Sequence, residues 1–86
     1  MSKIREFIEK NDLSFEEGSR NSTCIIIMGY AQHLGLSKEE LEEELKEEIE
    51  ADGVIQDEID ERWGYCSDNN YKKFWTSKEA GKQYIF

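Results

Sequence analysis

Apolar residues recur at every fourth position through a stretch that is otherwise dominated by acids, and this spacing constrains the fold most. Between residues 41 and 63 they form two sets: Leu41, Leu45 and Ile49, and then Ile55, Ile59 and Trp63. In a helix, residues four positions apart lie on one face, so the intervening acids face solvent. The pattern therefore predicts two amphipathic helices with narrow apolar stripes that face a common core.

Capping signals mark the limits of these two helices. Ser37 and Glu40 have the spacing of a capping box, in which each side chain bonds the other residue's backbone amide. The sequence Ala51-Asp52-Gly53 is expected to end the first helix. A break is expected from Gly64 to Asn70, after the second helix. The acidic stretch therefore predicts two successive antiparallel helices.

A third helix is predicted before Gly35, which supplies a left-handed stop. Asn21 and Ser22 are both common helix caps and are expected to begin it. The three isoleucines at 25–27 also fit a buried strand, because β-branched residues favour strands. The helix is preferred because the apolar residues keep a 3.6-residue period over a length that few strands reach.

Shorter elements are expected at both ends of the chain. Ile4, Phe7 and Ile8 share one face of a helix that ends near Asn11. Residues 12–19 predict a turn that reverses the chain. Near the other end, a turn with aromatic residues and a short last helix are expected.

The predicted fold class is therefore all-α, a small four- or five-helix bundle that forms one domain over residues 1–86. A chain of this length buries only roughly 60–65% of its unfolded surface, so its core is small. An enclosed active site with its own supporting shell does not fit in such a core. We therefore expect a protein that is not an enzyme, with no catalytic residues and no cofactor.

Side chains that bind metals or phosphates do not group by their spacing. The chain has one histidine, His33, and two distant cysteines without a Cys-x-x-Cys pair, which argues against a zinc site. The sequence Asp57-Glu58-x-Asp60-Glu61 is similar to paired magnesium ligands, but consecutive acids on a helix point to different sides. No glycine-rich phosphate loop occurs. No metal site is predicted, and His33 is expected to be a partly exposed residue near a helix end.

No segment is typical of a secreted or membrane protein. The longest apolar run, Cys24 to Met28, is far too short to cross a bilayer, and no leader-like segment is visible. We expect a cytoplasmic protein without a membrane partner. In that compartment Cys24 and Cys66 are expected to be reduced, mostly buried thiols and not a disulfide.

Charge is strongly segregated along the chain. The net charge is -9, and residues 39–62 alone hold thirteen acids against two bases, whereas residues 63–86 hold four lysines against two acids. Carboxylates repel phosphates within a Debye length of about 8–10 Å, so any DNA contact must lie away from the acidic stretch. The acidic face is either simply solvated or docks on the basic surface of a DNA-handling protein.

Two places remain as candidates for nucleic-acid or nucleotide binding. Arg20 and Asn21 stand at the start of the central helix, where backbone amides and the helix dipole attract anions. The alternative there is a helix cap with a surface salt bridge. The second place alternates aromatic and basic residues: Tyr71, Lys72, Lys73, Phe74 and Trp75. This alternation is typical of single-strand binding by stacking and phosphate contact, and its alternative is core burial of the aromatics.

One segment resembles a known family. Its matching residues are Gly18, Arg20, Asn21, Ala31, Leu34, Gly35, Leu36, Ser37 and Glu39. This pattern resembles the start of the small helical domain that lies C-terminal to many plasmid and phage primases. The resemblance covers about residues 15–75. It implies a domain that helps a primase to engage template and initiating nucleotide.

For this chain the resemblance implies a stand-alone replication accessory protein of a mobile element, which binds a DNA polymerase or primase, or a helicase, and assists primer initiation. Catalytic acids and metal ions would belong to that partner. Arg20, Asn21, Lys72, Lys73 and Trp75 would then contact single-stranded DNA or a nucleotide, while exposed parts of the acidic helices or the aromatic C-terminus would hold the protein partner.

Two other function classes fit the same composition. One is an acidic inhibitor that mimics DNA and occupies the groove of a host defence nuclease, because such a protein is also small, acidic and non-catalytic. The other is an unrelated helical interaction module. An accessory protein should increase retention of single-stranded DNA and promote synthesis without a primer, whereas a DNA mimic should compete with DNA for the partner.

Overall fold

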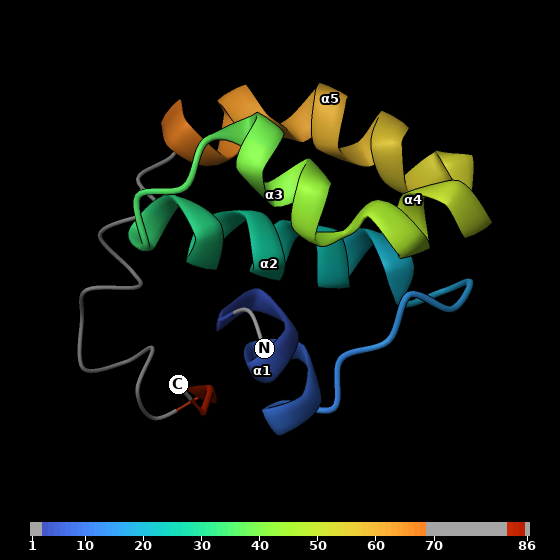
Figure 1. Cartoon of the computed structure of the whole chain (residues 1–86), viewed down its shortest axis with the longest axis horizontal. Helices are drawn as coiled ribbons and strands as arrows, with labels where there is room; N and C mark the ends of the chain where they lie inside the picture. The colour runs from blue at the N-terminus through green and yellow to red at the C-terminus, as the bar shows by residue number, and fades with distance from the viewer. Residues whose placement is uncertain (1–2, 69–82, 86) are drawn as a thin grey trace.

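The computed structural model describes residues 3–68 and 83–85, with side chains of residues 65–68 excepted. Within these ranges the protein is a compact all-α globule without strands (Figure 1). Its five helices are α1 Lys3–Lys10, α2 Arg20–His33, α3 Lys38–Glu44, α4 Lys46–Ala51 and α5 Gly53–Asp68. The predicted all-α class is confirmed, and the isoleucines at 25–27 are helical and not a strand.

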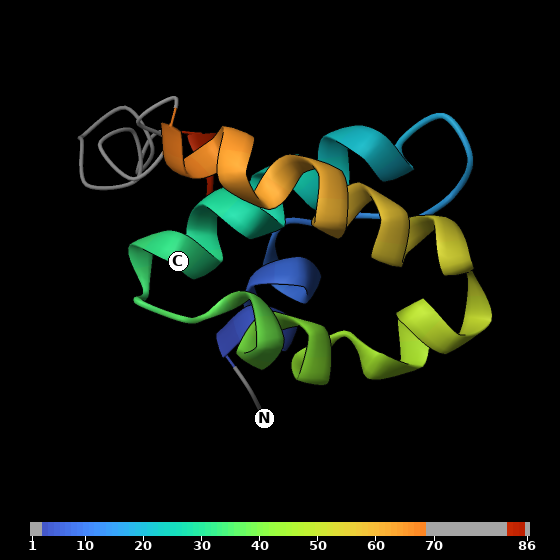
Figure 2. The ribbon, with the colours of Figure 1, turned by 90° about the horizontal axis from the view of Figure 1, so that it is seen from above.

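Helix α2 lies at the centre of the bundle. Helix α5 runs along it in the same direction, and α3 and α4 return beside them in the opposite direction (Figures 1 and 2). The α2–α5 interface is the most extensive, while α1 packs on α2 and α3. The predicted antiparallel arrangement of successive helices therefore holds from α2 through the pair α3–α4, here called the arm, to α5.

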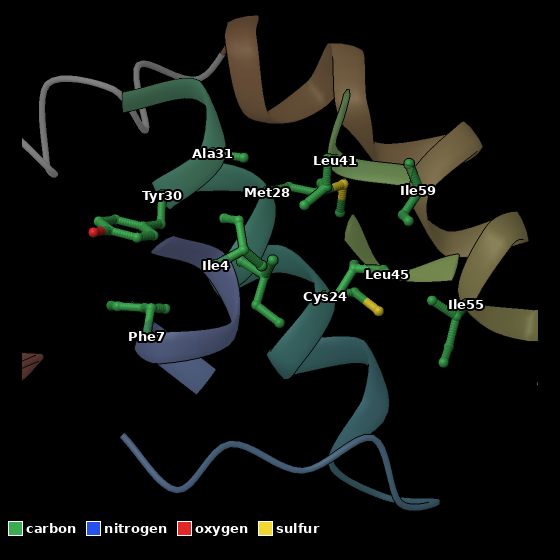
Figure 3. Close-up of a cluster of buried hydrophobic side chains, with 11 residues drawn as sticks. Ile4, Phe7, Cys24, Met28, Tyr30, Ala31, Leu41, Leu45, Ile55 and Ile59 are labelled. Atoms are coloured by element: carbon green, nitrogen blue, oxygen red, sulfur yellow. The ribbon is translucent and has the colours of Figure 1, made fainter. Parts of the chain in front are cut away.

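The core joins the described helices through a single cluster of apolar side chains (Figure 3). Its members are Ile4, Phe7, Cys24, Ile27, Met28, Tyr30, Ala31, Leu41, Leu45, Ile55 and Ile59. The two predicted stripes supply four of these residues, each at most 1% exposed. Ile49 and Trp63 pack partly buried at the edge of the cluster. The fourfold spacing thus predicted both the helices and the face that they bury.

The start of α2 differs from the prediction. The helix begins at Arg20, with Ser19 at the cap position, and the Ser19 side chain makes no cap hydrogen bond. The predicted caps Asn21 and Ser22 lie inside the first turn instead. The reason is the preceding turn, in which the Glu16 carbonyl accepts from the amides of Ser19 and Arg20 at 3.0 and 2.9 Å. This turn leads directly into the helix and satisfies the Arg20 amide, so the helix begins one residue before the predicted caps.

The predicted turn before α2 is confirmed. Residues 13–19 contain no helix, and Asp12 and Gly18 adopt left-handed backbone angles, with φ of 51° and 95°. Such angles reverse the chain direction within a few residues. The connection therefore brings α1 back against α2.

The end of α2 follows the prediction. Gly35 has φ of 82°, and its amide donates to Gln32 at 3.1 Å while the Leu36 amide donates to Ala31 at 3.0 Å. These two bonds form a Schellman motif, which requires a left-handed residue where glycine has no steric penalty. It ends α2 and turns the chain toward the arm.

The predicted capping box at the start of α3 is also present. The Glu40 amide donates to Ser37 Oγ at 3.1 Å, and the Ser37 amide donates to Glu40 Oε1 at 3.0 Å. The predicted first acidic helix is, however, bent into α3 and α4 at Leu45, where φ is −100° and ψ is 16°. Hydrogen bonds from Leu45 to Leu41 and from Ile49 to Leu45 continue across the bend. The arm therefore curves around the core and remains one hydrogen-bonded unit (Figure 2).

The predicted break at Gly64 is wrong, because α5 continues to Asp68. Glycine costs about 1 kcal/mol in a helix interior, and the contacts of α5 with α2 outweigh this local preference. The predicted later turn and last helix fall mainly on residues 69–82, outside the described residues. None of the described helices has both the length and the apolarity to span a membrane.

Candidate interaction surface on the arm and α5

The sequence spacing that buries the apolar stripes also places carboxylates on the opposite sides of the same helices. The exposed acids of the arm and α5 are Glu39, Glu40, Glu43, Glu47, Glu50, Asp57, Asp60 and Glu61. We call this set the acidic surface. Residues 3–68 and 83–85 contain nineteen acids and seven lysines or arginines, so the described part of the chain is more acidic than the whole.

A polar network holds α3 against α5 at one edge of the acidic surface. Lys38 Nζ lies 2.6 Å from Asp60 and 3.4 Å from Glu42. The side-chain amide Nε2 of Gln56 donates to Glu42 and, at 3.0 Å, to Asp60. The hydrogen bond between Lys38 and Asp60 raises the pKa of Lys38 and lowers the pKa of Asp60. The network therefore compensates part of the negative charge and fixes the two helices together.

A shallow groove of about 360 Å³ lies between the arm and α5, next to this network. Its lining residues are Glu39, Glu42, Glu43, Lys46, Ile49, Glu50 and Gln56. Four glutamates line the groove together with the partly buried Ile49, and Lys46 is the one base in the lining. Such a groove suits a lysine or arginine side chain, because the aliphatic stem can cover Ile49 while the charge meets carboxylates.

The structure places Arg20 in a salt bridge at the end of the arm. Arg20 Nη1 lies 2.6 Å from Oδ2 of Asp52, the residue between α4 and α5, and the two side chains are 26% and 32% exposed. Asp52 Oδ1 also accepts from the Val54 amide at 3.1 Å. The Val54 amide, and after it Arg20, lower the pKa of Asp52. Asp52 thus caps the start of α5 and fixes it to the start of α2.

This geometry corresponds to the salt bridge that the sequence left open as the alternative for Arg20. Asn21 is the next residue of α2 and is exposed beside it. The Arg20 charge is compensated by Asp52, so a phosphate would have to share or displace this carboxylate. The other predicted binding residues lie outside the described residues: Tyr71, Lys72, Lys73 and Trp75. They remain predictions.

The other two arginines of the described ranges also pair with acids. Arg5 makes a two-pronged pair with Glu48, with one bond of 2.7 Å, and Glu48 raises the pKa of Arg5. This pair joins α1 to α4. Arg62 lies 2.7 Å from Glu58 one turn earlier on α5. The i,i+4 spacing could have predicted the Arg62 pair, whereas no local signal connects Arg5 with an acid 43 positions away.

The remaining reactive side chains of the described part lie apart from the acidic surface. Cys24 is a buried free thiol, and burial raises its pKa to about 11, so it stays protonated and unreactive near neutral pH. The predicted burial of Cys24 is confirmed, while the Cys66 side chain lies outside the description. His33 is partly exposed in the last turn of α2, as predicted. Among the described residues, no three His, Cys, Asp or Glu side chains are placed to hold a metal ion.

Comparison with known proteins adds no relative. No family model matches the chain, and neither the curated proteins nor the solved structures contain a match. We therefore infer function from the geometry of the acidic surface and from the sequence itself.

Proposed function

We propose that this protein is a small non-catalytic accessory protein of DNA replication, which docks on a DNA polymerase or primase through the acidic surface. The observation that carries the proposal is the groove between the arm and α5, which four glutamates line together with Ile49. Proteins that handle DNA present basic surfaces, and complementary charge accelerates and orients their association with an acidic partner. The resemblance to the primase-associated helical domain supports the choice of a replication enzyme as that partner.

Four cations among the described residues are already engaged in salt bridges, which favours the acidic surface as the place where a partner binds. Arg5, Arg20 and Arg62 each meet a carboxylate of the protein itself, and Lys38 meets two. A cation that is already paired gains less from a phosphate, because it must give up or share its partner. In this proposal the engagement of single-stranded template belongs to Lys72, Lys73 and Trp75, in complex with the partner.

The test is copurification of partners from the native host, followed by their identification. The wild-type chain should recover a polymerase, primase or helicase, and Glu43→Gln with Glu50→Gln should lose it because both carboxylates line the groove. A matched control is Glu9→Gln with Glu17→Gln, which removes two exposed acids outside the acidic surface. This control should retain the partner. Recovery of a nuclease or restriction complex would contradict the proposal.

A DNA-mimic inhibitor is the second candidate, and the excess of exposed carboxylates on the acidic surface favours it. The two functions give opposite results with the purified partner. The accessory protein should increase retention of single-stranded DNA by its partner and promote synthesis without a primer. A mimic should displace DNA from the partner, with an effect that weakens as salt screens the shared charge.

A further inference from the structure

The segment 83–85 lies against α1, although most of the chain separates them (Figure 1). The Tyr84 ring meets the Phe7 ring, with centroids 5.9 Å apart. The Ile85 backbone makes two hydrogen bonds with the Asn11 side chain. Its N–H donates to Asn11 Oδ1 at 2.7 Å, and its carbonyl accepts from Asn11 Nδ2 at 2.8 Å. Asn11 therefore recognises a backbone unit, and the Ile85 side chain stays 59% exposed.

The receiving surface is built by α1 and α2. The Asn11 side chain also donates to the Phe7 carbonyl at 2.9 Å, and the Asn11 amide donates to the same oxygen at 3.1 Å. These bonds fix the orientation of the Asn11 side chain at the end of α1. Phe7 in turn stacks on Tyr30 of α2, with centroids 4.1 Å apart and ring planes 17° apart (Figure 3). A side-chain amide of fixed orientation and a ring supported by Tyr30 thus contact the segment 83–85.

We propose that Asn11, Phe7 and Tyr30 form a peptide-binding site, which Tyr84 and Ile85 occupy in cis. Its ligand is a peptide segment of a partner protein, with an aromatic residue followed by a residue whose backbone N–H and carbonyl are free. The occupied state defines this chemistry, because the described contacts of the segment include a ring contact of Tyr84 and a two-sided backbone contact of Ile85. The site uses no residue of the acidic surface and is independent of the proposed replication role.

Because the chain's own residues 84 and 85 occupy the site, an added peptide must compete with them. A tethered segment competes at a high effective concentration, so an added peptide binds the wild-type chain only through the fraction of molecules in which residues 84 and 85 are released. Weakening the tethered segment should therefore strengthen binding of an added peptide.

The test uses the full chain and a capped hexapeptide with the sequence of residues 81–86, titrated by NMR. Tyr84→Ala in the chain should raise the affinity for the peptide by about tenfold or more, because the competitor is weakened. Ile85→Ala is the matched control and should bind as the wild type does, because it keeps the backbone N–H and carbonyl. Adding Asn11→Ala to Tyr84→Ala should abolish the gain. A control peptide with alanine in place of tyrosine should not bind.

The site is refuted if the folded Tyr84→Ala chain binds neither peptide, binds both equally, or binds as well without Asn11. Where Tyr84→Ala loses its helical circular dichroism, the wild-type chain provides the test instead. Excess peptide should then move the Tyr84 ring signals to the positions of a free tyrosine. Unchanged Tyr84 signals at saturating peptide would overturn the proposal.

Discussion

The acidic surface and the aromatic corner, formed by Phe7, Tyr30 and Tyr84, are assembled in opposite ways. The acidic surface comes from one continuous stretch, and its shape follows from local spacing and capping between residues 37 and 63. The aromatic corner joins three distant parts of the chain through ring contacts. In the two proposals, charge would select a partner of the acidic surface, whereas ring contact and backbone hydrogen bonds would select a peptide at the aromatic corner.

The two surfaces differ because the helices that carry them bury different shares of their residues in the small core. The arm and α5 bury only narrow stripes, which leaves their remaining faces for carboxylates. Helix α1 instead places Ile4 and Phe7 in the core and is joined to the arm by the Arg5–Glu48 pair. The acidic surface should therefore tolerate polar changes, whereas changes in the buried stripes should affect the whole fold.

The largest effect is expected where an acidic helix meets the core. Leu41→Ala should lower the free energy of unfolding by about 2–5 kcal/mol, because it leaves a cavity at a residue that is 0% exposed. Ile49→Ala, on the same stripe but only partly buried, should cost clearly less. Urea unfolding followed by circular dichroism measures both. Equal losses would show that the stripe is not packed against one core.

A smaller effect should separate two glycines that the sequence alone does not distinguish. Gly35→Ala should destabilise by about 1 kcal/mol, because φ of 82° strains any residue with a Cβ. Gly64→Ala should stabilise by about 0.5–1 kcal/mol, because alanine favours a helix and its Cβ would meet nothing within 4 Å. Thermal unfolding of the two variants checks the opposite signs. A destabilising Gly64→Ala would contradict the continuation of α5 through this position.

Acid should weaken the ion pairs that connect the acidic helices. The pKa of Asp60 is lowered in the folded protein by Lys38 and Gln56. The stability that Asp60 contributes to the folded protein is therefore fully present above the unfolded carboxyl pKa of about 4. It is lost as pH falls through the lower pKa that Asp60 has in the folded protein. Asp60→Asn should reduce this loss, seen as a smaller difference in melting temperature between pH 6 and pH 3.

The matched control for Asp60 is Asp57→Asn, which removes an exposed acid from the same helix. No ion pair is recorded for Asp57 within the described ranges, so this change should leave the acid-induced loss unaltered. The opposite order of the two variants would show that the Lys38 network does not connect α3 with α5.

The smallest effect concerns the groove that is proposed to bind a partner. Glu43→Gln with Glu50→Gln should leave stability unchanged or raise it by about 0.5 kcal/mol or less, because repulsion between neighbouring carboxylates falls. Salt should reduce the stability difference between this variant and the wild-type chain, because it screens the repulsion between carboxylates. Melting temperatures at low and high salt measure it. A marked loss of stability would show that the two acids serve the fold and not a partner.

Much of the fold could be predicted from the sequence because its signals are local. The spacing of Leu41, Leu45, Ile55 and Ile59 predicted which face of each helix is buried, and all four are core residues. The stop at Gly35 and the box of Ser37 and Glu40 depend on residues within one turn, so they too were predictable. The break at Gly64 was wrong because packing against α2 outweighs the propensity of one glycine.

The candidate surface likewise has features that the sequence predicts and features that only the tertiary structure decides. Sequence alone determined that acids would cover the outer faces of two successive helices, since helical periodicity fixes their direction once the apolar stripe is buried. Only the tertiary structure decided that Arg20 meets Asp52, that Lys38 joins Asp60, and that Tyr84 rests on Phe7. Those contacts join side chains that are far apart in the sequence. They depend on how the elements pack against one another, and the spacing of residues within one helix does not determine that packing.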